Sequence, residues 1–347
     1  MELQSRRHTV QDLSDAIELC FTNGWTDGLP VIPPTADRIE AMLNAAGLDP
    51  QRQIAFIENR QVSITAEKVA INAVMAGCKA EYMPVVVAAV EALADPLYSY
   101  HGPATSTGGS AVFMVVNGPI ARRLDINCGD NLFGPGWRAN ATIGRAVRLV
   151  MRNVIGTLPG ELDRSCLGHG GKYTYCIAEN EAQSPWPAFH TTRGFRPEQN
   201  VVTIFAALAP HQYSNQLSAT PEGILETACA QMRISAGTAR QPQYALVFAG
   251  EHMETMRNGG WSREDVQRYC FEHSQASAAE IKRANIKPGA SPRTMRRHWF
   301  RSLEPQRTFS LSQRAAGPAC SRHLSPAGAE KVVRKASAER FVNRSSE

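Results

Sequence analysis

The sequence predicts an α/β (or α+β) protein with a largely buried mixed sheet flanked by helices. First, 347 residues with 43% hydrophobic content can form a sizeable core. Second, the nearly continuous apolar run Ala111–Val116 is typical of a strand covered on both faces. Third, strand-like and helix-like segments alternate after it, which is the pattern of α/β and α+β proteins.

The N-terminal part, residues 1–100, is predicted to be helical. Val10, Leu13, Ile17 and Phe21 recur at helical spacing and predict a helix over 10–22. Two further segments have apolar residues at helical spacing and are each followed by a glycine. These glycines should end the helices that the segments form. The further helices are predicted over 35–46 (ended by Gly47), 65–76 (ended by Gly77) and 81–94.

Residues 101–285 should form an α/β part of the same domain or a second domain. Val115–Leu124 and Val247–Met256 both have the order strand, glycine turn, helix. They are either an internal pseudo-repeat or two unrelated units of this common kind. Strands are predicted over 111–116, 173–178, 201–207 and 244–248, and helices over 120–124, 139–155, 221–232, 251–258 and 262–274.

The last segment, 286–347, is a basic tail with little apolar periodicity. It carries 13 Lys and Arg against 4 Asp and Glu, whereas residues 1–285 carry 24 against 28. The tail is predicted to be disordered, or to be the product of a shifted reading frame. Because the body is mildly acidic, nucleic-acid binding has no electrostatic support there.

The chain is expected to be cytoplasmic. It has no run of about 18 apolar residues, and the first 30 residues lack the pattern of a secretory signal. The eight cysteines are scattered, with no Cys-x-x-Cys pair, which predicts free thiols in a reducing compartment.

The stretch Asn127–Arg148 is the most informative part of the sequence, because a polar, glycine-rich loop leads directly into a helix. Backbone N–H groups of such a loop and the positive end of the helix can hold an anionic or carbonyl-bearing molecule. The alternative is a glycine-rich connector in which Asn140 caps the helix. Neither a Walker loop nor a dinucleotide fingerprint is present. The predicted substrate-binding residues of this stretch are Asn131, Gly134, Gly136, Arg138 and Asn140.

Two thiols are candidate catalytic groups. Cys78 directly follows a predicted helix stop and precedes Lys79, a setting that favours a thiolate nucleophile or redox centre. Cys128, in the loop described above, has a similar claim. The alternative for both is a buried packing residue.

Later loops add polar candidates. His169 could move protons near neutral pH, and Lys172 could hold a carboxylate or phosphate. Glu179 and Glu181 should face one side of an extended chain. Together with His169 they are weak candidates for metal ligands, the alternative being a solvated loop and strand end. His211 and Asn215 follow a predicted strand end, where α/β sheets place substrate-binding residues. No cofactor is indicated.

Four segments resemble an uncharacterised bacterial family associated with UGSC-motif (seleno)proteins. They lie within residues 20–285 and cover 24–35, 72–84, 127–148 and 168–181. The resemblance implies a thiol- or redox-linked enzyme, with a UGSC-type (seleno)protein as a candidate partner. The chain has no Cys-Gly-Ser-Cys motif of its own. Relatives continue with an apolar strand and a glycine-rich turn where this chain has its basic tail.

Together these features predict a cytoplasmic enzyme that acts on a small polar or anionic substrate with a reactive thiol, by redox or lyase chemistry. The alternative is a non-catalytic subunit that binds a ligand or a partner (seleno)protein. Missing Gly-x-Ser-x-Gly and His-Glu-x-x-His motifs argue against the commonest serine hydrolases and zinc proteases.

Overall fold

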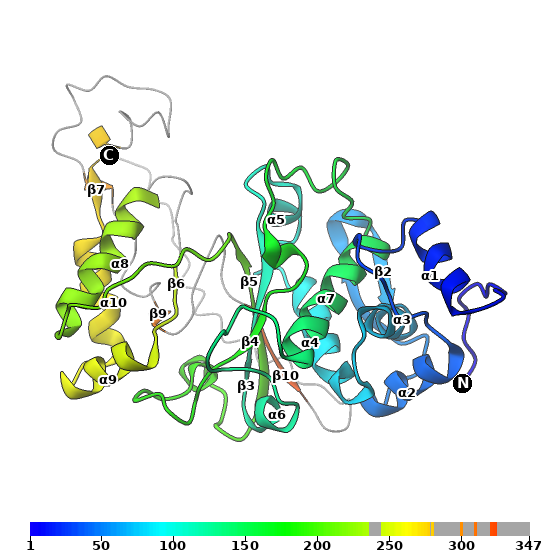
Figure 1. Ribbon diagram of the computed structural model, residues 1–347, viewed down its shortest axis with the longest axis horizontal. Helices are drawn as coiled ribbons and strands as arrows, with labels where there is room; N and C mark the ends of the chain where they lie inside the picture. The colour runs from blue at the N-terminus through cyan, green and yellow to red at the C-terminus, as the bar shows by residue number, and fades with distance from the viewer. Residues whose placement is uncertain (236–243, 278, 281–298, 301–308, 311–319, 325–347) are drawn as a thin grey trace, which may run out of the picture.

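The computed structural model describes residues 1–235, 244–277, 279–280, 299–300, 309–310 and 320–324. The fold is a mixed α/β arrangement, as predicted, with a small sheet between helices (Figure 1). The elements of the N-terminal part are α1 (Leu13–Thr22), α2 (Ala36–Ala46), β1 (Gln53–Ile57), η1 (Glu58–Arg60), β2 (Val62–Thr65), α3 (Ala66–Ala76), η2 (Ala80–Tyr82) and α4 (Met83–Leu93).

The predicted ends of α2 and α3 are confirmed, whereas α1 begins at Leu13, three residues after the predicted start at residue 10. Thr65 lies at the N-cap of α3 and its hydroxyl accepts from the Lys68 amide at 3.4 Å. Gly47 and Gly77 end α2 and α3 with φ of 64° and 91°, which glycine adopts without strain. The description of this part as helical was incomplete, because β1 and β2 form an antiparallel hairpin.

The central sheet has four strands in the order β10-β5-β3-β4. β3 and β4 run parallel, with Met114 opposite Cys176, whereas β5 runs antiparallel to β3. β10 pairs antiparallel with the outer edge of β5. The elements of this part are α5 (His101–Thr105), β3 (Ala111–Asn117), α6 (Pro119–Arg123), α7 (Arg138–Asn153), η3 (Gly170–Lys172), β4 (Cys176–Ala178), η4 (Phe189–Arg193) and β5 (Asn200–Ala207).

The two faces of the sheet belong to different cores. Met114 and Val116 face the helices α3, α4 and α7 in the largest core, which lies beside the sheet in Figure 1. Phe113 and Val115 point the other way, as alternation along a strand requires. There they pack in a smaller aromatic core with Phe189 of η4.

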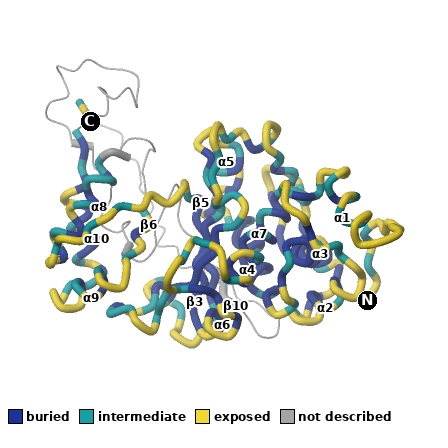
Figure 2. The backbone as a smooth tube through the Cα atoms, in the orientation of Figure 1, coloured by how far each residue is buried: buried dark blue, intermediate teal, exposed yellow. Residues whose placement is uncertain are grey.

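A third core holds the C-terminal helices together. It includes Trp186 and buried residues of the three helices, and Figure 2 shows it as a separate group of buried segments. Ser262 and Asp265 form a capping box at the start of α10 (Arg263–His273). The elements are α8 (Pro221–Ser235), β6 (Ala245–Leu246), α9 (Gly250–Asn258), α10 (Arg263–His273) and β7 (Ala276–Ser277).

The predicted pseudo-repeat corresponds to β3–α6 and β6–α9. Both have the expected order, but β3 lies in the central sheet whereas β6 pairs with β9 (Phe309–Ser310). Most of the predicted disordered or frameshifted tail lies outside the described residues. Within it the structure describes three short strands, β8 (Trp299–Phe300), β9 and β10 (Cys320–Leu324).

Helix α7 lies very close to the strand β4. Gly144 faces the chain just before β4, and a Cβ atom there would lie 2.4 Å from Thr174 Oγ1 and 2.9 Å from the Tyr175 nitrogen. No larger residue fits between helix and sheet without displacing one of them. Gly144 therefore sets the distance between these two elements.

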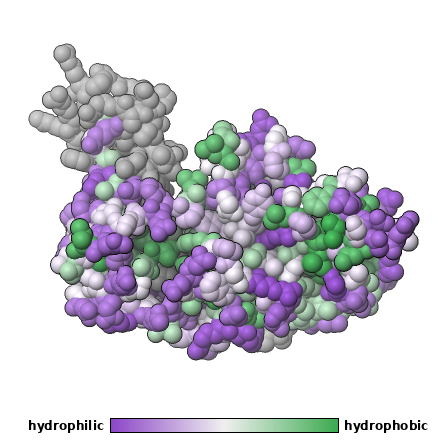
Figure 3. Space-filling view, viewed as in Figure 1, coloured by the Kyte–Doolittle hydropathy of each residue, from purple (hydrophilic) through white to green (hydrophobic). Residues whose placement is uncertain are grey.

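The visible surface is mixed, with hydrophobic residues gathered over the region of α1 and α3 (Figure 3). Leu13 of α1 is 66% exposed. No helix among the described residues is long and apolar enough to cross a membrane.

Candidate functional site

Three arginines of α7, spaced seven residues apart, form hydrogen bonds to residues of the N-terminal part. Arg145 donates to both carboxylate oxygens of Asp27 at 2.7 and 2.8 Å. Arg152 donates to the Gly24 carbonyl, and Arg138 donates twice to the Gly77 carbonyl at the end of α3. Arg138, which we expected to bind substrate, thus satisfies a carbonyl of α3.

The loop before α7 also uses its polar groups internally. The buried Asn140 amide accepts from the Asn127 nitrogen at 2.7 Å and donates to the Cys176 carbonyl at 3.0 Å. Asn131 has a φ of 51° and donates to the Pro135 carbonyl, while its own carbonyl accepts from the Gly134 amide. The loop is therefore a connector tied to β4, and Gly136, with φ of 129°, supplies a turn that suits glycine.

The two candidate thiols lie in surroundings that disfavour a thiolate. Cys78 is 7% exposed, its Sγ donates to the Thr142 carbonyl at 3.3 Å, and burial raises its pKa to about 12. The expectation that its position lowers the pKa is wrong, because loss of hydration outweighs the nearby charges of Arg138 and Arg145. Burial also raises the pKa of Cys128, and the charge of Glu181 adds to that effect.

Glu179 and Glu181 face the same side, as predicted, because the Asn117 side-chain amide donates to both, at 2.5 and 2.8 Å. Glu179 also accepts from the Phe189 amide, and Glu181 from the Gly118 amide. Burial raises the pKa of Glu179, although the charge of Arg263 opposes the shift. Among the described residues, no three His, Cys, Asp or Glu side chains are grouped so that they could hold a metal ion.

The predicted pair after β5 lies on a different part of the molecule. His211 is exposed. The Asn215 amide donates to the Gly223 carbonyl and to Thr227, at 2.9 Å each, and accepts from the Ser218 amide. Asn215 therefore organises the first turns of α8.

A charged cluster lies near the start of β4. The buried carboxylate of Asp163 accepts from Arg148 of α7 at 2.7 Å and from Lys172 of η3 at 2.7 and 2.9 Å. Lys172 also donates to the Ser165 hydroxyl at 2.7 Å. Asp163 is 4% exposed, and the two cations are 16% and 14% exposed. We call Arg148, Asp163, Lys172 and Ser165 the charged cluster.

The pKa values in the cluster reflect burial and charge together. Burial disfavours the Asp163 carboxylate, yet its hydrogen bonds with Lys172, Ser165 and Arg148 hold its pKa well below the ordinary range. Burial lowers the pKa of Lys172, and the charge of Arg148 adds to that shift, although Asp163 opposes both. Two cations thus share one carboxylate, which leaves one positive charge in excess.

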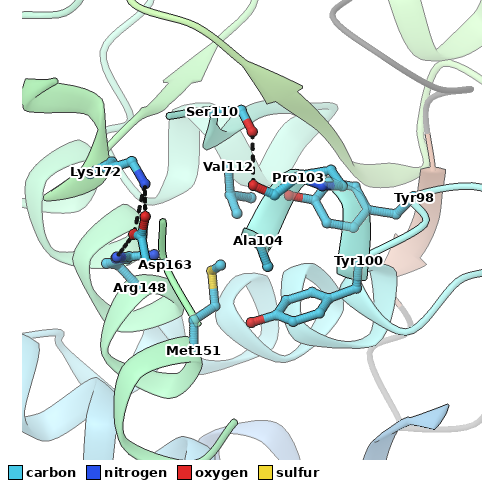
Figure 4. A pocket seen from close by; sticks show the side chains of 10 residues that line it. All are labelled: Tyr98, Tyr100, Pro103, Ala104, Ser110, Val112, Arg148, Met151, Asp163 and Lys172. Atoms are coloured by element: carbon cyan, nitrogen blue, oxygen red, sulfur yellow. Dashed lines mark hydrogen bonds and ion pairs between the residues drawn. The ribbon is translucent and has the colours of Figure 1, made fainter. Parts of the chain in front are cut away.

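Two small cavities flank these cations. The first is lined by Arg148, Asp163 and Lys172 of the charged cluster and, on its other side, by Tyr98 and Tyr100 (Figure 4). The second lies toward Gly144 and Gly171. Each has room for about one water molecule. Both share the same four side chains, Val112, Arg148, Met151 and Lys172.

His169 lies in the loop that carries Lys172. Its Nδ1 accepts from the Gly171 amide at 3.2 Å, and its ring packs edge-on against Tyr175. Its Nε2 is buried and has no hydrogen-bond partner among the described residues. Burial lowers its pKa and the charge of Lys172 adds to the effect, although the Ala207 and Gly109 carbonyls oppose it. The lowered pKa favours the neutral form of the ring.

Of the residues singled out in the sequence, only Lys172 lines either cavity. Arg148 was the last residue of the Asn127–Arg148 stretch but received no role, and Asp163, Ser165 and Tyr98 carried no motif. A buried carboxylate shared by two cations is a property of tertiary packing, so no local spacing points to it. Comparison with protein-family models, curated proteins and solved structures finds no match. The resemblance to the UGSC-associated family therefore stays a prediction.

Proposed function

We propose that this protein is a cytoplasmic enzyme that acts on a small anionic substrate, a carboxylate or phosphate, held by Arg148 and Lys172. The observation that supports the proposal is the excess positive charge of the charged cluster, in side chains that are largely buried. A buried charge without a counter-ion costs free energy, which an anionic ligand would recover.

Arg148 has hydrogen-bond donors that no described residue uses and that could bind such a ligand. Its Nη2 donates to Asp163, and its Nε and Nη1 donate to no other described residue. A guanidinium with two adjacent N–H groups matches the geometry of a carboxylate or phosphate. Because Arg148 lines both cavities, these donors are next to the space where a ligand would bind.

A ligand larger than water needs the two cavities to merge. Met151, Lys172 and Arg148, which line both, have long side chains with several rotatable bonds. Met151 in particular can change rotamer at low cost, because its side chain is unbranched. Movement of these side chains would join the two spaces around the cations.

Two groups near the cavities suit proton transfer. The pKa of Lys172 is lowered, and His169 precedes it by three residues. We assign no nucleophilic role to Cys78 or Cys128, because burial raises the pKa of both. The seven cysteines whose side chains the structure describes are free thiols, which supports a reducing compartment.

The proposal is tested by anion binding to the full-length protein. Propionate and inorganic phosphate are titrated at constant ionic strength, with chloride as the control anion, while the melting temperature and the heat of binding are followed. We expect one or both oxyanions to raise the melting temperature, and chloride to have no such effect. Equal responses to all three anions would contradict a specific anion site.

Variants locate the binding. Arg148→Lys keeps a positive charge beside Asp163 but removes the guanidinium fork, so anion affinity should fall at least tenfold. Lys172→Met should also weaken binding. Lys79→Met is the matched control, because Lys79 is half-exposed, lies 3.6 Å from Glu81 and lines neither cavity. Turnover of a substrate found by such screening distinguishes an enzyme from a non-catalytic binding subunit.

A further inference from the structure

Tyr98 is a buried residue whose hydroxyl is used by no other residue that the structure describes. The residue is 4% exposed and lines the first cavity. Its hydroxyl makes no hydrogen bond to any residue that the structure describes. Its neighbour Tyr100, by contrast, is hydrogen-bonded to Thr157 at 2.5 Å.

The Tyr98 hydroxyl is not one of the fully enclosed polar atoms without a partner, so the water-sized cavity that Tyr98 lines reaches it, and an oxygen atom of a ligand could replace the water there. Burial raises the pKa of Tyr98 above its ordinary range, so the phenol stays protonated and can donate a hydrogen bond. The residue lies across the cavity from Arg148, Asp163 and Lys172 (Figure 4). The first cavity is thus lined by the cations Arg148 and Lys172 on one side and by the Tyr98 hydroxyl on the other.

We infer that Tyr98 recognises a second oxygen atom of the substrate, a hydroxyl or carbonyl group, while Arg148 and Lys172 hold its anionic end. This inference rests on the proposed function and narrows the substrate class to small anions with a second oxygen-bearing group, such as hydroxy or oxo acids. Val112, Met151 and Ala104 line the same cavity and offer an apolar contact for the carbon atoms between the two groups.

The test compares two ligands that differ only in the second oxygen. Lactate and propionate have the same number of carbon atoms and the same charge, and lactate adds one hydroxyl. Binding of each to the full-length protein is measured by calorimetry. We expect the wild type to bind lactate about fivefold to tenfold more tightly than propionate, as one extra neutral hydrogen bond provides.

Tyr98→Phe removes only the hydroxyl. The lactate-to-propionate ratio should fall to about one, while the affinity for propionate stays as in the wild type. Tyr244→Phe is the matched control, because its hydroxyl donates to the Met232 carbonyl in the C-terminal helical part, away from the cavity. That variant should keep the wild-type ratio.

The outcomes separate the two proposals. If wild type binds both ligands equally, or if Tyr98→Phe keeps the preference for lactate, the role of Tyr98 is wrong and anion binding by the charged cluster stands. If neither carboxylate binds and phosphate does not bind either, both proposals are wrong. The lactate-to-propionate ratio of the wild type is informative even if the variant folds poorly.

Discussion

Arg145 and Asp27, 118 residues apart in the chain, form a two-pronged ion pair with N–O distances of 2.8 and 2.7 Å. Arg145 also donates to the carbonyls of Leu29 and Pro30. Burial disfavours the Asp27 carboxylate, but hydrogen bonding with Arg145 and the arginine charge outweigh that effect and lower its pKa. Residues 27–30 are therefore held on α7 by the Arg145 side chain.

Arg145→Ala should destabilise the fold by about 3 kcal/mol, because it leaves Asp27, which is 8% exposed, as a buried charge without its partner. Urea unfolding measures the difference. Lys79→Ala removes a half-exposed ion pair and should change stability little. If the two variants are equally stable, the Arg145–Asp27 pair does not hold the segment.

The stability provided by Asp163 should depend on pH. Its pKa is lowered in the folded protein, so its contribution is complete above the ordinary value of about 3.9 and is lost as the pH falls below it. Asp163→Asn lacks this titration. The difference in unfolding free energy between wild type and variant, about 3 kcal/mol at pH 7, should shrink at pH 3. A gap that stays constant or widens would contradict the ion-pair assignment.

The thiols should differ sharply in reactivity. Cys166 is exposed, whereas Cys78 and Cys176 are buried and each has its pKa raised to about 12. Iodoacetamide should therefore modify Cys166 first in the native protein and reach the other two only after unfolding. Peptide mass spectrometry gives the order. Rapid native labelling of Cys78 would restore it as a candidate nucleophile.

The two neighbouring tyrosines should respond differently to loss of their hydroxyls. Tyr100→Phe leaves Thr157 without its partner and should cost about 1 kcal/mol. Tyr98→Phe removes a hydroxyl that bonds to no described residue, so stability should stay unchanged or increase. Thermal unfolding of both variants provides the comparison. A larger loss in Tyr98→Phe would show that its hydroxyl has a structural partner.

The sequence predicted elements whose signals are local. Thr65 and Gly77 bound α3 as expected, and β3 follows from an apolar run that neighbouring layers cover on both faces. The β1–β2 hairpin was missed, because its turn has Gln61 at φ of 54° rather than the asparagine and glycine of a common hairpin turn.

The candidate site was predicted only in part, because its groups meet through the fold. Lys172 was named as an anion ligand, but its partner Asp163 and the second cation on that carboxylate, Arg148, come from other parts of the chain. Conversely, the polar residues of the loop before α7 looked available for a ligand. Asn140 instead binds Asn127 and Cys176, which are 13 and 36 residues away in the chain. The sequence pattern shows which polar side chains the loop carries. It does not show their hydrogen-bond partners, because these come from residues that only the tertiary fold brings close.

Gly144 has a consequence for the charged cluster as well as for packing. It lies one turn before Arg148 on α7 and contacts the chain that connects Lys172 to β4. A methyl group at this position would push α7 and β4 apart. It would thereby move Arg148 and Lys172 away from the Asp163 carboxylate that they share. The geometry of the charged cluster, and with it the proposed anion binding, thus depends on the absence of a single carbon atom.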